Sequence, residues 1–138
     1  MLHRFSMPRS LVSVSPAAQA VTAVMTDWEE EARDAIDLAL VEALTNIVRH
    51  GPQGETRPIG IEATLLADRI SVDIVDVTPP VPPDLLQRAG TAGLDFDPTD
   101  LQSIPESGRG LALILLMVDE ASLHEDGQMS RLRLVRRR

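Results

Sequence analysis

The stretch Leu38–Gly51 reads Leu-Ala-Leu-Val-Glu-Ala-Leu-Thr-Asn-Ile-Val-Arg-His-Gly, and it decides the fold. Good helix formers with apolar residues on almost every side predict a buried helix. Before Arg49, its only polar residues are Glu42, Thr45 and Asn46, and Glu42 and Asn46 share one helical face. Polar side chains on a buried helix need a partner or a ligand, because burying them unpaired is costly. We therefore interpret this stripe as a site rather than as a solvated helix end.

Composition excludes several classes of function. A chain of 138 residues has room for one domain with one core. The net charge of −8 and the scarcity of aromatic residues disfavour nucleic-acid binding. The chain has no Cys, and its three His show no metal-ligand spacing, so disulfides, thiol nucleophiles and zinc sites are not expected.

The chain carries no apolar run long enough to span a membrane. The apolar run near its N-terminus is short and is broken by Ser13 and Ser15, so we do not interpret it as a signal peptide. These features predict a cytoplasmic protein that acts without a membrane partner.

Hydrophobic periodicity predicts strands and helices that segregate into layers. Ser15 and Pro16 are typical of a helix start, and Gly51 is typical of a helix end. In chain order we expect a strand over 2–7, a helix over 17–25, a helix that ends at Gly51, strands over 59–66 and 70–77, a helix over 111–118, strands over 121–124 and 129–135, and a basic tail over 136–138. This order favours a single α+β domain over residues 1–138, a two-layer sandwich whose mixed, mostly antiparallel sheet is covered on one face by helices.

The segment from about 78 to 107 differs from its surroundings. It opens with Thr78-Pro79-Pro80-Val81-Pro82-Pro83, which cannot supply ladder hydrogen bonds, and it continues with further Gly, Pro and acidic residues. Long irregular segments inside small domains are usually functional lids or disordered. We expect a lid here.

Three positions carry candidate chemistry. The first is the pair of Glu42 and Asn46. The side-chain oxygen of Asn46 suits Mg²⁺, whose coordination shell substrate phosphates would complete. The carboxylate of Glu42, one turn away, could accept the proton of a hydroxyl group. Asp76 ends an apolar strand, where it could accept the amino group of adenine, although solvation of a strand end explains an isolated Asp more simply. Asp73 on the same strand faces the opposite side.

The third position is Gly108-Arg109-Gly110-Leu111, where two glycines precede an apolar helix. Backbone N–H groups at a helix start bind anions, glycine permits close approach of phosphate, and Arg109 could add charge. A hinge at the start of the helix explains the glycines equally well. The segment lacks the Gly-Lys-Ser/Thr of a P-loop.

The order of these features is more specific than any one of them. It resembles the ATP-binding fold shared by gyrase-type ATPases and histidine kinases. Two segments, Leu40–Gly51 and Gly108–Glu120, resemble the anti-sigma-factor serine kinases of bacterial partner-switching systems, and the resemblance spans essentially the whole chain.

The resemblance implies roles on the phosphate side of an ATP site. Asn46 would coordinate Mg²⁺ that bridges the ATP phosphates. Glu42 would act as the catalytic base toward a serine or threonine hydroxyl of a partner protein. Arg49 and His50 match the basic pair that closes the family motif and would lie near the phosphates.

On the base side and beneath the lid, Asp76 would bind the adenine amino group. Phosphate contacts are implied for Gly108, Arg109, Gly110 and Leu111. The family places Gly two residues after the Asp, where this chain has Thr78, whose side chain and following prolines restrict the backbone.

The resemblance therefore implies an ATP- and Mg²⁺-dependent serine/threonine protein kinase. Its substrate would be a small STAS-domain antagonist, its second partner a sigma factor or another regulatory target, and family members are often homodimers. The alternative is a non-catalytic partner-binding module on the same fold with weakened or lost ATP binding. An isolated histidine-kinase ATP domain ranks below both, because the chain lacks a dimerising helix pair with a phospho-accepting His.

Overall fold

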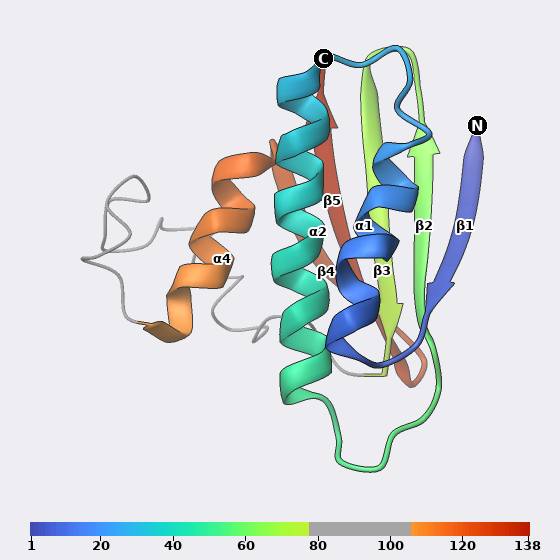
Figure 1. Ribbon diagram of the computed structural model, residues 1–138, viewed down its shortest axis with the longest axis vertical. Coiled ribbons are helices and arrows are strands. Elements are labelled where there is room, and N and C mark those ends of the chain that lie inside the picture. Colours follow the sequence, from blue (N-terminus) through green and yellow to red (C-terminus); the bar gives the residue numbers. More distant parts are fainter. Residues whose placement is uncertain (78–105) are drawn as a thin grey trace.

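The computed structural model describes residues 1–77 and 106–138, without the side chains of 106–109 and 126 (Figure 1). One five-stranded sheet has the order β1-β2-β3-β5-β4, and each of its pairings is antiparallel. The elements are β1 (Leu2–Met7), a 3-10 turn (Leu11–Ser13), α1 (Val14–Thr22), α2 (Glu30–His50), β2 (Ile59–Leu65), β3 (Arg69–Asp76), α4 (Glu106–Met117), β4 (Glu120–Asp126) and β5 (Met129–Arg137). The predicted α+β fold is confirmed, with an antiparallel rather than a mixed sheet over this part of the chain.

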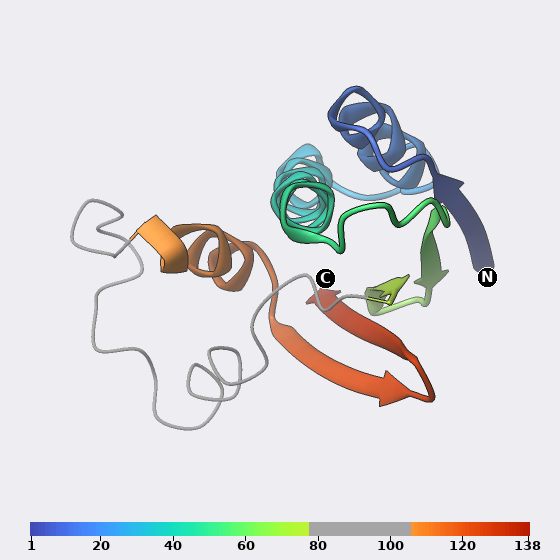
Figure 2. The ribbon, with the colours of Figure 1, turned by 90° about the horizontal axis from the view of Figure 1, so that it is seen from below.

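Helix α2 is the central element of the helical layer. It lies along the sheet between α1 and α4, and Figure 2 shows all three helices on one side of the sheet. Its large apolar side chains are almost fully buried, with Ile36, Leu40 and Leu44 at 0% exposure and Ile47 at 1%. Burying such a side chain stabilises a fold by roughly 1.5–3 kcal/mol, so α2 is a rigid support for its polar stripe.

The core between the two layers is aliphatic, as the scarcity of aromatic residues predicts. Alternate residues of β2 and β3 face the helices, and the fully buried ones are Ile59, Ile61, Ala63, Ile70, Val72 and Ile74. The antiparallel hairpin of β2 and β3 therefore has the predicted inward face. Over the described ranges, no helix is long and apolar enough to cross a membrane.

The first helix begins and ends earlier than the sequence predicts. It starts at Val14 with Ser13 at its N-cap, so Ser15 lies inside the first turn and caps nothing. It also stops at Thr22, and Met25 follows outside the helix as a fully buried core residue. The earlier start follows from the 3-10 turn over Leu11–Ser13, which leads directly into the helix.

The predicted basic tail is wrong, because Arg136 and Arg137 extend strand β5. Arg138 folds back on the start of α2, where its guanidinium lies 4.7 Å from the centre of the Trp28 ring. It also forms an ion pair with Asp27 at 2.8 Å. These arginines are therefore structural parts of the domain.

The sheet face opposite the helices carries a charged network centred on Asp73. Arg133 donates two hydrogen bonds of 2.9 Å to its carboxylate, and Arg131 donates one of 2.8 Å and another to Glu62. Burial pushes the pKa of Asp73 up, but the hydrogen bonds from Arg133 and Arg131 outweigh burial, so the pKa lies below its usual range. The ionised carboxylate therefore stabilises the fold.

Replacing Asp73 by Asn should lower the free energy of unfolding at neutral pH by about 2 kcal/mol, because charge-assisted hydrogen bonds are lost. A lowered folded pKa means that this contribution is complete above the unfolded pKa and disappears as the pH falls through the folded value. Urea unfolding at pH 7 and at progressively lower pH measures both effects. Asp68→Asn is the control, since that carboxylate is 69% exposed and should change stability little. Equal losses in the two variants would contradict the assignment.

Candidate functional site

The polar stripe of α2 faces helix α4. Glu42 and Asn46 are partly buried, whereas Ala43 and Leu44 between them are fully buried in the core. A Cβ atom built on Gly110 of α4 would lie 3.2 Å from Glu42 Oε2 and 3.3 Å from Asn46 Nδ2. The two side chains therefore share one face, as predicted, and both lie directly against the backbone of α4.

Helix α4 begins at Glu106, so Gly108, Arg109 and Gly110 lie within its first turns rather than before it. The unpaired N–H groups of a helix belong to its first four residues, and Gly110 is the fifth residue of α4. The missing side chain of Gly110 lets the Glu42 carboxylate and the Asn46 amide pack closely against the backbone of α4. The predicted contact of Gly110 with phosphate stays a prediction.

The structure places the other predicted site residues near the start of α4 in different environments. Leu111 is 3% exposed and belongs to the core, so its side chain supports the helix. Gly108 and Arg109 lie in the first turn, where helix N–H groups are unpaired. Thr78 and the predicted lid up to residue 105 lie outside the described residues.

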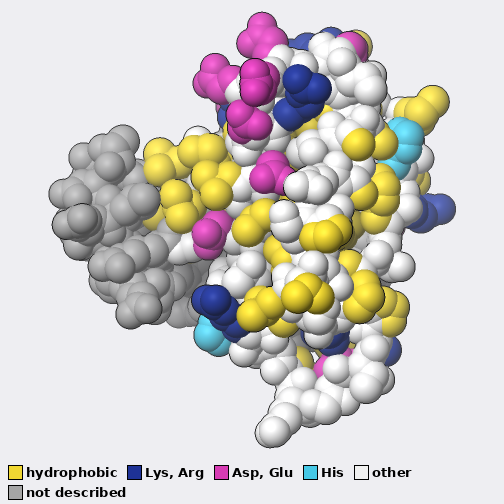
Figure 3. All heavy atoms as spheres, viewed as in Figure 1, with side chains coloured by type: hydrophobic (Ala, Val, Ile, Leu, Met, Phe, Trp, Pro, Cys, Tyr) yellow, Lys and Arg dark blue, Asp and Glu magenta, His cyan; other side chains and the backbone are white. Residues whose placement is uncertain are grey.

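Arg49 and His50 form the exposed C-terminal turn of α2. Acidic side chains gather over the N-terminal part of α2, and basic and histidine side chains lie near its other end (Figure 3). This arrangement complements the helix dipole, which favours cations at the C-terminus. Both basic side chains are exposed, and we expect them to be able to meet a negatively charged group.

Gly51 ends α2 for a reason that the sequence does not reveal. Its φ of −68° and ψ of 165° are open to any residue, so the left-handed conformation typical of a terminal glycine does not explain it. A Cβ at Gly51 would lie 2.8 Å from the Ile47 carbonyl oxygen and 3.1 Å from Arg9 Nη1. Glycine is favoured here because a side chain would meet the backbone carbonyl of Ile47, and Arg9 packs on the same position.

Asp76 ends β3 as a buried residue, at 1% exposure, so solvation of a strand end does not account for it. Its carboxylate forms an ion pair with Arg9, whose Nη2 donates to Oδ1. The Ser130 hydroxyl donates to the Asp76 carbonyl oxygen at 3.1 Å and fixes the strand end. Asp73 faces the other side of the sheet, as its spacing predicts.

Sequence reasoning missed Arg9. It follows β1 and pairs with a carboxylate 67 positions further along the chain. One basic residue after a Pro at a strand end gives no local pattern from which this pairing could be inferred. Gly51 at the end of α2 is an indirect sign of the packing of Arg9, since a Cβ there would lie 3.1 Å from Arg9 Nη1.

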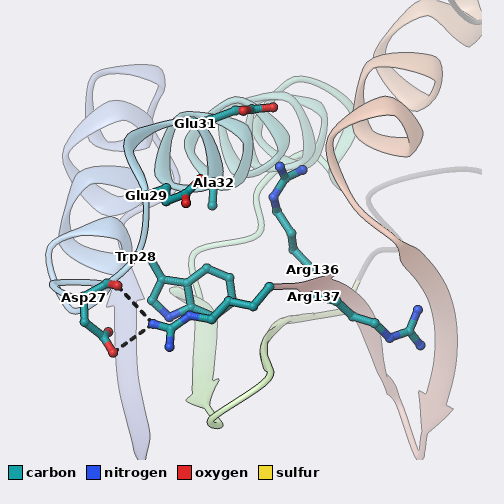
Figure 4. Close-up of a pocket in the computed structure, with 8 residues that line it drawn as sticks. Asp27, Trp28, Glu29, Glu31, Ala32, Arg136 and Arg137 are labelled. Carbon is teal, nitrogen blue, oxygen red and sulfur yellow. Dashed lines mark hydrogen bonds and ion pairs between the residues drawn. The ribbon is translucent and has the colours of Figure 1, made fainter.

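A cavity of about 330 Å³ lies at the opposite end of α2 and contains none of the predicted residues. Figure 4 shows its lining, with Arg136 pointing toward the start of α2 and with Asp27 and Trp28 beside the C-terminal strand. Ala32 in this lining is about 15 Å along the helix from Glu42. The cavity is therefore separate from the polar stripe. Of its lining residues, Asp27 and Arg138 pair with each other, whereas Arg137 pairs with Glu120 outside the cavity.

Comparison with solved structures gives an independent view of the fold. The crystal structure of the RsbU and RsbW domains of Rv1364c from Mycobacterium tuberculosis matches with a TM-score of 0.61 and 16% sequence identity. The match covers 99% of this chain and 32% of that one, so this chain spans about a third of the longer protein. No curated protein sequence matches this chain.

The likeness at this identity shows a shared fold. A family model described as the histidine kinase-like ATPase domain matches residues 7–136, which include every described element of the helical layer and the site on α2. The predicted resemblance to this superfamily is confirmed, and the chain belongs to the histidine kinase-like ATPase domain family.

Proposed function

We propose that this protein is an ATP-dependent serine/threonine protein kinase of the anti-sigma type, which phosphorylates a STAS-domain antagonist and sequesters a sigma factor or another regulatory target. The observation that carries the proposal is the placement of Glu42 and Asn46 together against Gly110. Family membership supports ATP as the ligand. We expect it to act in the cytoplasm, and the resemblance implies that a homodimer is a possible form.

The residues present fit a magnesium–nucleotide complex on the phosphate side. Asn46 supplies a hard oxygen ligand for Mg²⁺, which when bound would neutralise phosphate charge. The Asn46 amide lies close against the backbone of α4 at Gly110, where a side chain would meet it. Arg49 and His50 add positive charge at the same end of α2.

Glu42 would act on the protein substrate. Its carboxylate accepts the proton of the attacking serine hydroxyl while the serine oxygen bonds to the γ-phosphorus. The bond from that phosphorus to the bridging oxygen breaks, and ADP leaves with the electron pair. A rigid helix that holds the base one turn from the magnesium ligand suits this transfer.

A specific observation favours a second candidate, a non-catalytic partner-binding module with weakened ATP binding. Asp76, the proposed acceptor of the adenine amino group, already forms an ion pair with Arg9. In the sequence, Thr78-Pro79-Pro80 stands where the resemblance leads us to expect glycine. Both features bear on the base side and leave the phosphate side unaffected.

Calorimetric titration with ATP and Mg²⁺ separates the two functions. The kinase proposal expects saturable binding with a Kd below about 1 mM, followed by transfer of phosphate to a STAS-domain antagonist. If millimolar ATP produces no heat of binding, the kinase proposal is contradicted and the non-catalytic partner-binding module is the function that stands. If ATP binds but no phosphate is transferred to a STAS-domain antagonist, ATP binding is supported and the proposed reaction is contradicted.

A further inference from the structure

A groove of about 530 Å³ lies between the N-terminal half of α2 and the C-terminal end of α4. Its apolar lining includes Leu38 of α2 and Leu116 and Met117 of α4, and Leu116 is 38% exposed. Arg136 Nη1 donates a hydrogen bond of 2.7 Å to the Met117 carbonyl oxygen, which ties the end of α4 to β5. The groove therefore presents apolar surface on elements that the fold holds in place.

Carboxylates line the α2 side of this groove. Glu30, Glu31 and Asp34 belong to its lining, and Asp37 follows about one turn after Asp34. Within residues 1–77 and 106–138, as far as their side chains are described, none of the four forms an ion pair. Figure 3 shows acidic side chains over the N-terminal part of α2 next to hydrophobic side chains over α4. The groove thus combines an apolar wall with an acidic rim.

The helix dipole accounts for only part of this negative charge. It favours acidic residues in the first turn, which are Glu30 and Glu31, and its effect fades beyond that turn. Asp34 lies four residues after Glu30, and Asp37 lies three residues after Asp34, spacings at which like charges destabilise a helix. Burial and, less strongly, the Asp34 charge raise the pKa of Asp37. A positively charged partner would relieve this repulsion.

We propose that the groove binds a basic amphipathic helix of a partner protein. Apolar side chains at helical spacing would pack on Leu38, Leu116 and Met117, while Lys or Arg side chains beside them would meet the carboxylates of α2. The same negative charge repels nucleic acids and anionic membranes. The inference goes beyond the proposed kinase reaction, because binding in this groove needs no nucleotide.

Two synthetic peptides of about 16 residues, built from the same numbers of Leu and Lys, test the inference. One peptide places its Leu residues on a single helical face, and the other distributes them around the helix. Fluorescence anisotropy without ATP, at about 0.15 M salt, should give a Kd below about 100 μM for the first peptide and binding at least about tenfold weaker for the second. In the wild-type protein, the amide NMR signals of Leu38, Leu116 and Met117 should shift when the first peptide is added.

Two variants of the groove have matched controls elsewhere on the surface. Leu116→Asn and Asp34→Lys should each weaken binding of the first peptide about tenfold. Leu66→Asn is the control for the apolar wall, since Leu66 is 48% exposed just after β2. Asp68→Lys is the control for charge, since its carboxylate is 69% exposed and lies outside the groove. Both controls should bind within about threefold of the wild type.

Equal affinity for the two peptides would overturn the inference, because the attraction would then depend on net charge alone. An equal loss in Asp34→Lys and Asp68→Lys would have the same meaning. Unchanged amide signals in the groove overturn it even if Leu116→Asn does not fold. If the wild type self-associates in sedimentation and Leu116→Asn abolishes the association, a second copy of this chain occupies the groove and the inference is wrong. None of these outcomes bears on the kinase proposal, which the ATP titration tests separately.

Discussion

Glu42→Ala is expected to lower phosphate transfer to a STAS-domain antagonist about 100- to 10,000-fold, the usual contribution of a general base. ATP affinity should stay within about threefold of the wild type, because the proposed role of Glu42 concerns the substrate hydroxyl rather than the nucleotide. The carboxylate lies beside Gly110, where a partner's serine could approach it without meeting a side chain from that position. Transfer of radiolabelled phosphate measures the rate, and calorimetry measures binding.

Two variants make the Glu42 experiment specific. Arg33→Ala lies nine residues before Glu42 and on the opposite face of α2, so it should leave transfer largely unchanged. Glu42→Gln keeps the size of the side chain and removes its ability to accept a proton, so it should be as inactive as Glu42→Ala. Transfer that persists in both Glu42 variants would show that another group is the base.

Much of the helical layer could be predicted because α2 has an unusually clear pattern. Its apolar residues exclude a surface helix, and its two polar residues one turn apart fall on one face by helix geometry alone. The hairpin of β2 and β3 was equally predictable, since alternation over two strands separated by a short turn has few other solutions. These features depend only on local periodicity.

What could not be predicted depends on contacts between distant segments. The ion pair of Arg9 with Asp76 spans 67 positions, and no local pattern encodes it. Both glycines also have contacts with distant segments: Arg9 Nη1 lies 3.1 Å from a Cβ position on Gly51, and Glu42 Oε2 lies 3.2 Å from a Cβ position on Gly110. Sequence alone gave these glycines local roles, at a helix end and at a helix start.

The two halves of the candidate site therefore differ in how far the sequence determines them. The proposed phosphate half depends on one helix face, which the motif on α2 predicts, and on one glycine of a neighbouring helix, whose packing the motif does not predict. The proposed base half depends on which group reaches Asp76 in the folded chain, and there Arg9 pairs with it across 67 positions. The sequence therefore determines the proposed phosphate half more fully than the base half.

Asn46→Ala is expected to lower the affinity for ATP with Mg²⁺ about 100-fold, because loss of a metal ligand removes the bridge between the helix and the phosphates. Without Mg²⁺, the variant and the wild type should bind ATP equally weakly. Asn46 is only partly buried and does not belong to the apolar core, so truncating its side chain should leave the core of α2 intact. Asn46→Asp retains an oxygen ligand and should keep most of the Mg²⁺ dependence.

An equal loss of ATP affinity with and without Mg²⁺ would show that Asn46 contacts the nucleotide directly. An unchanged affinity of Asn46→Ala would show that Asn46 does not belong to the nucleotide site.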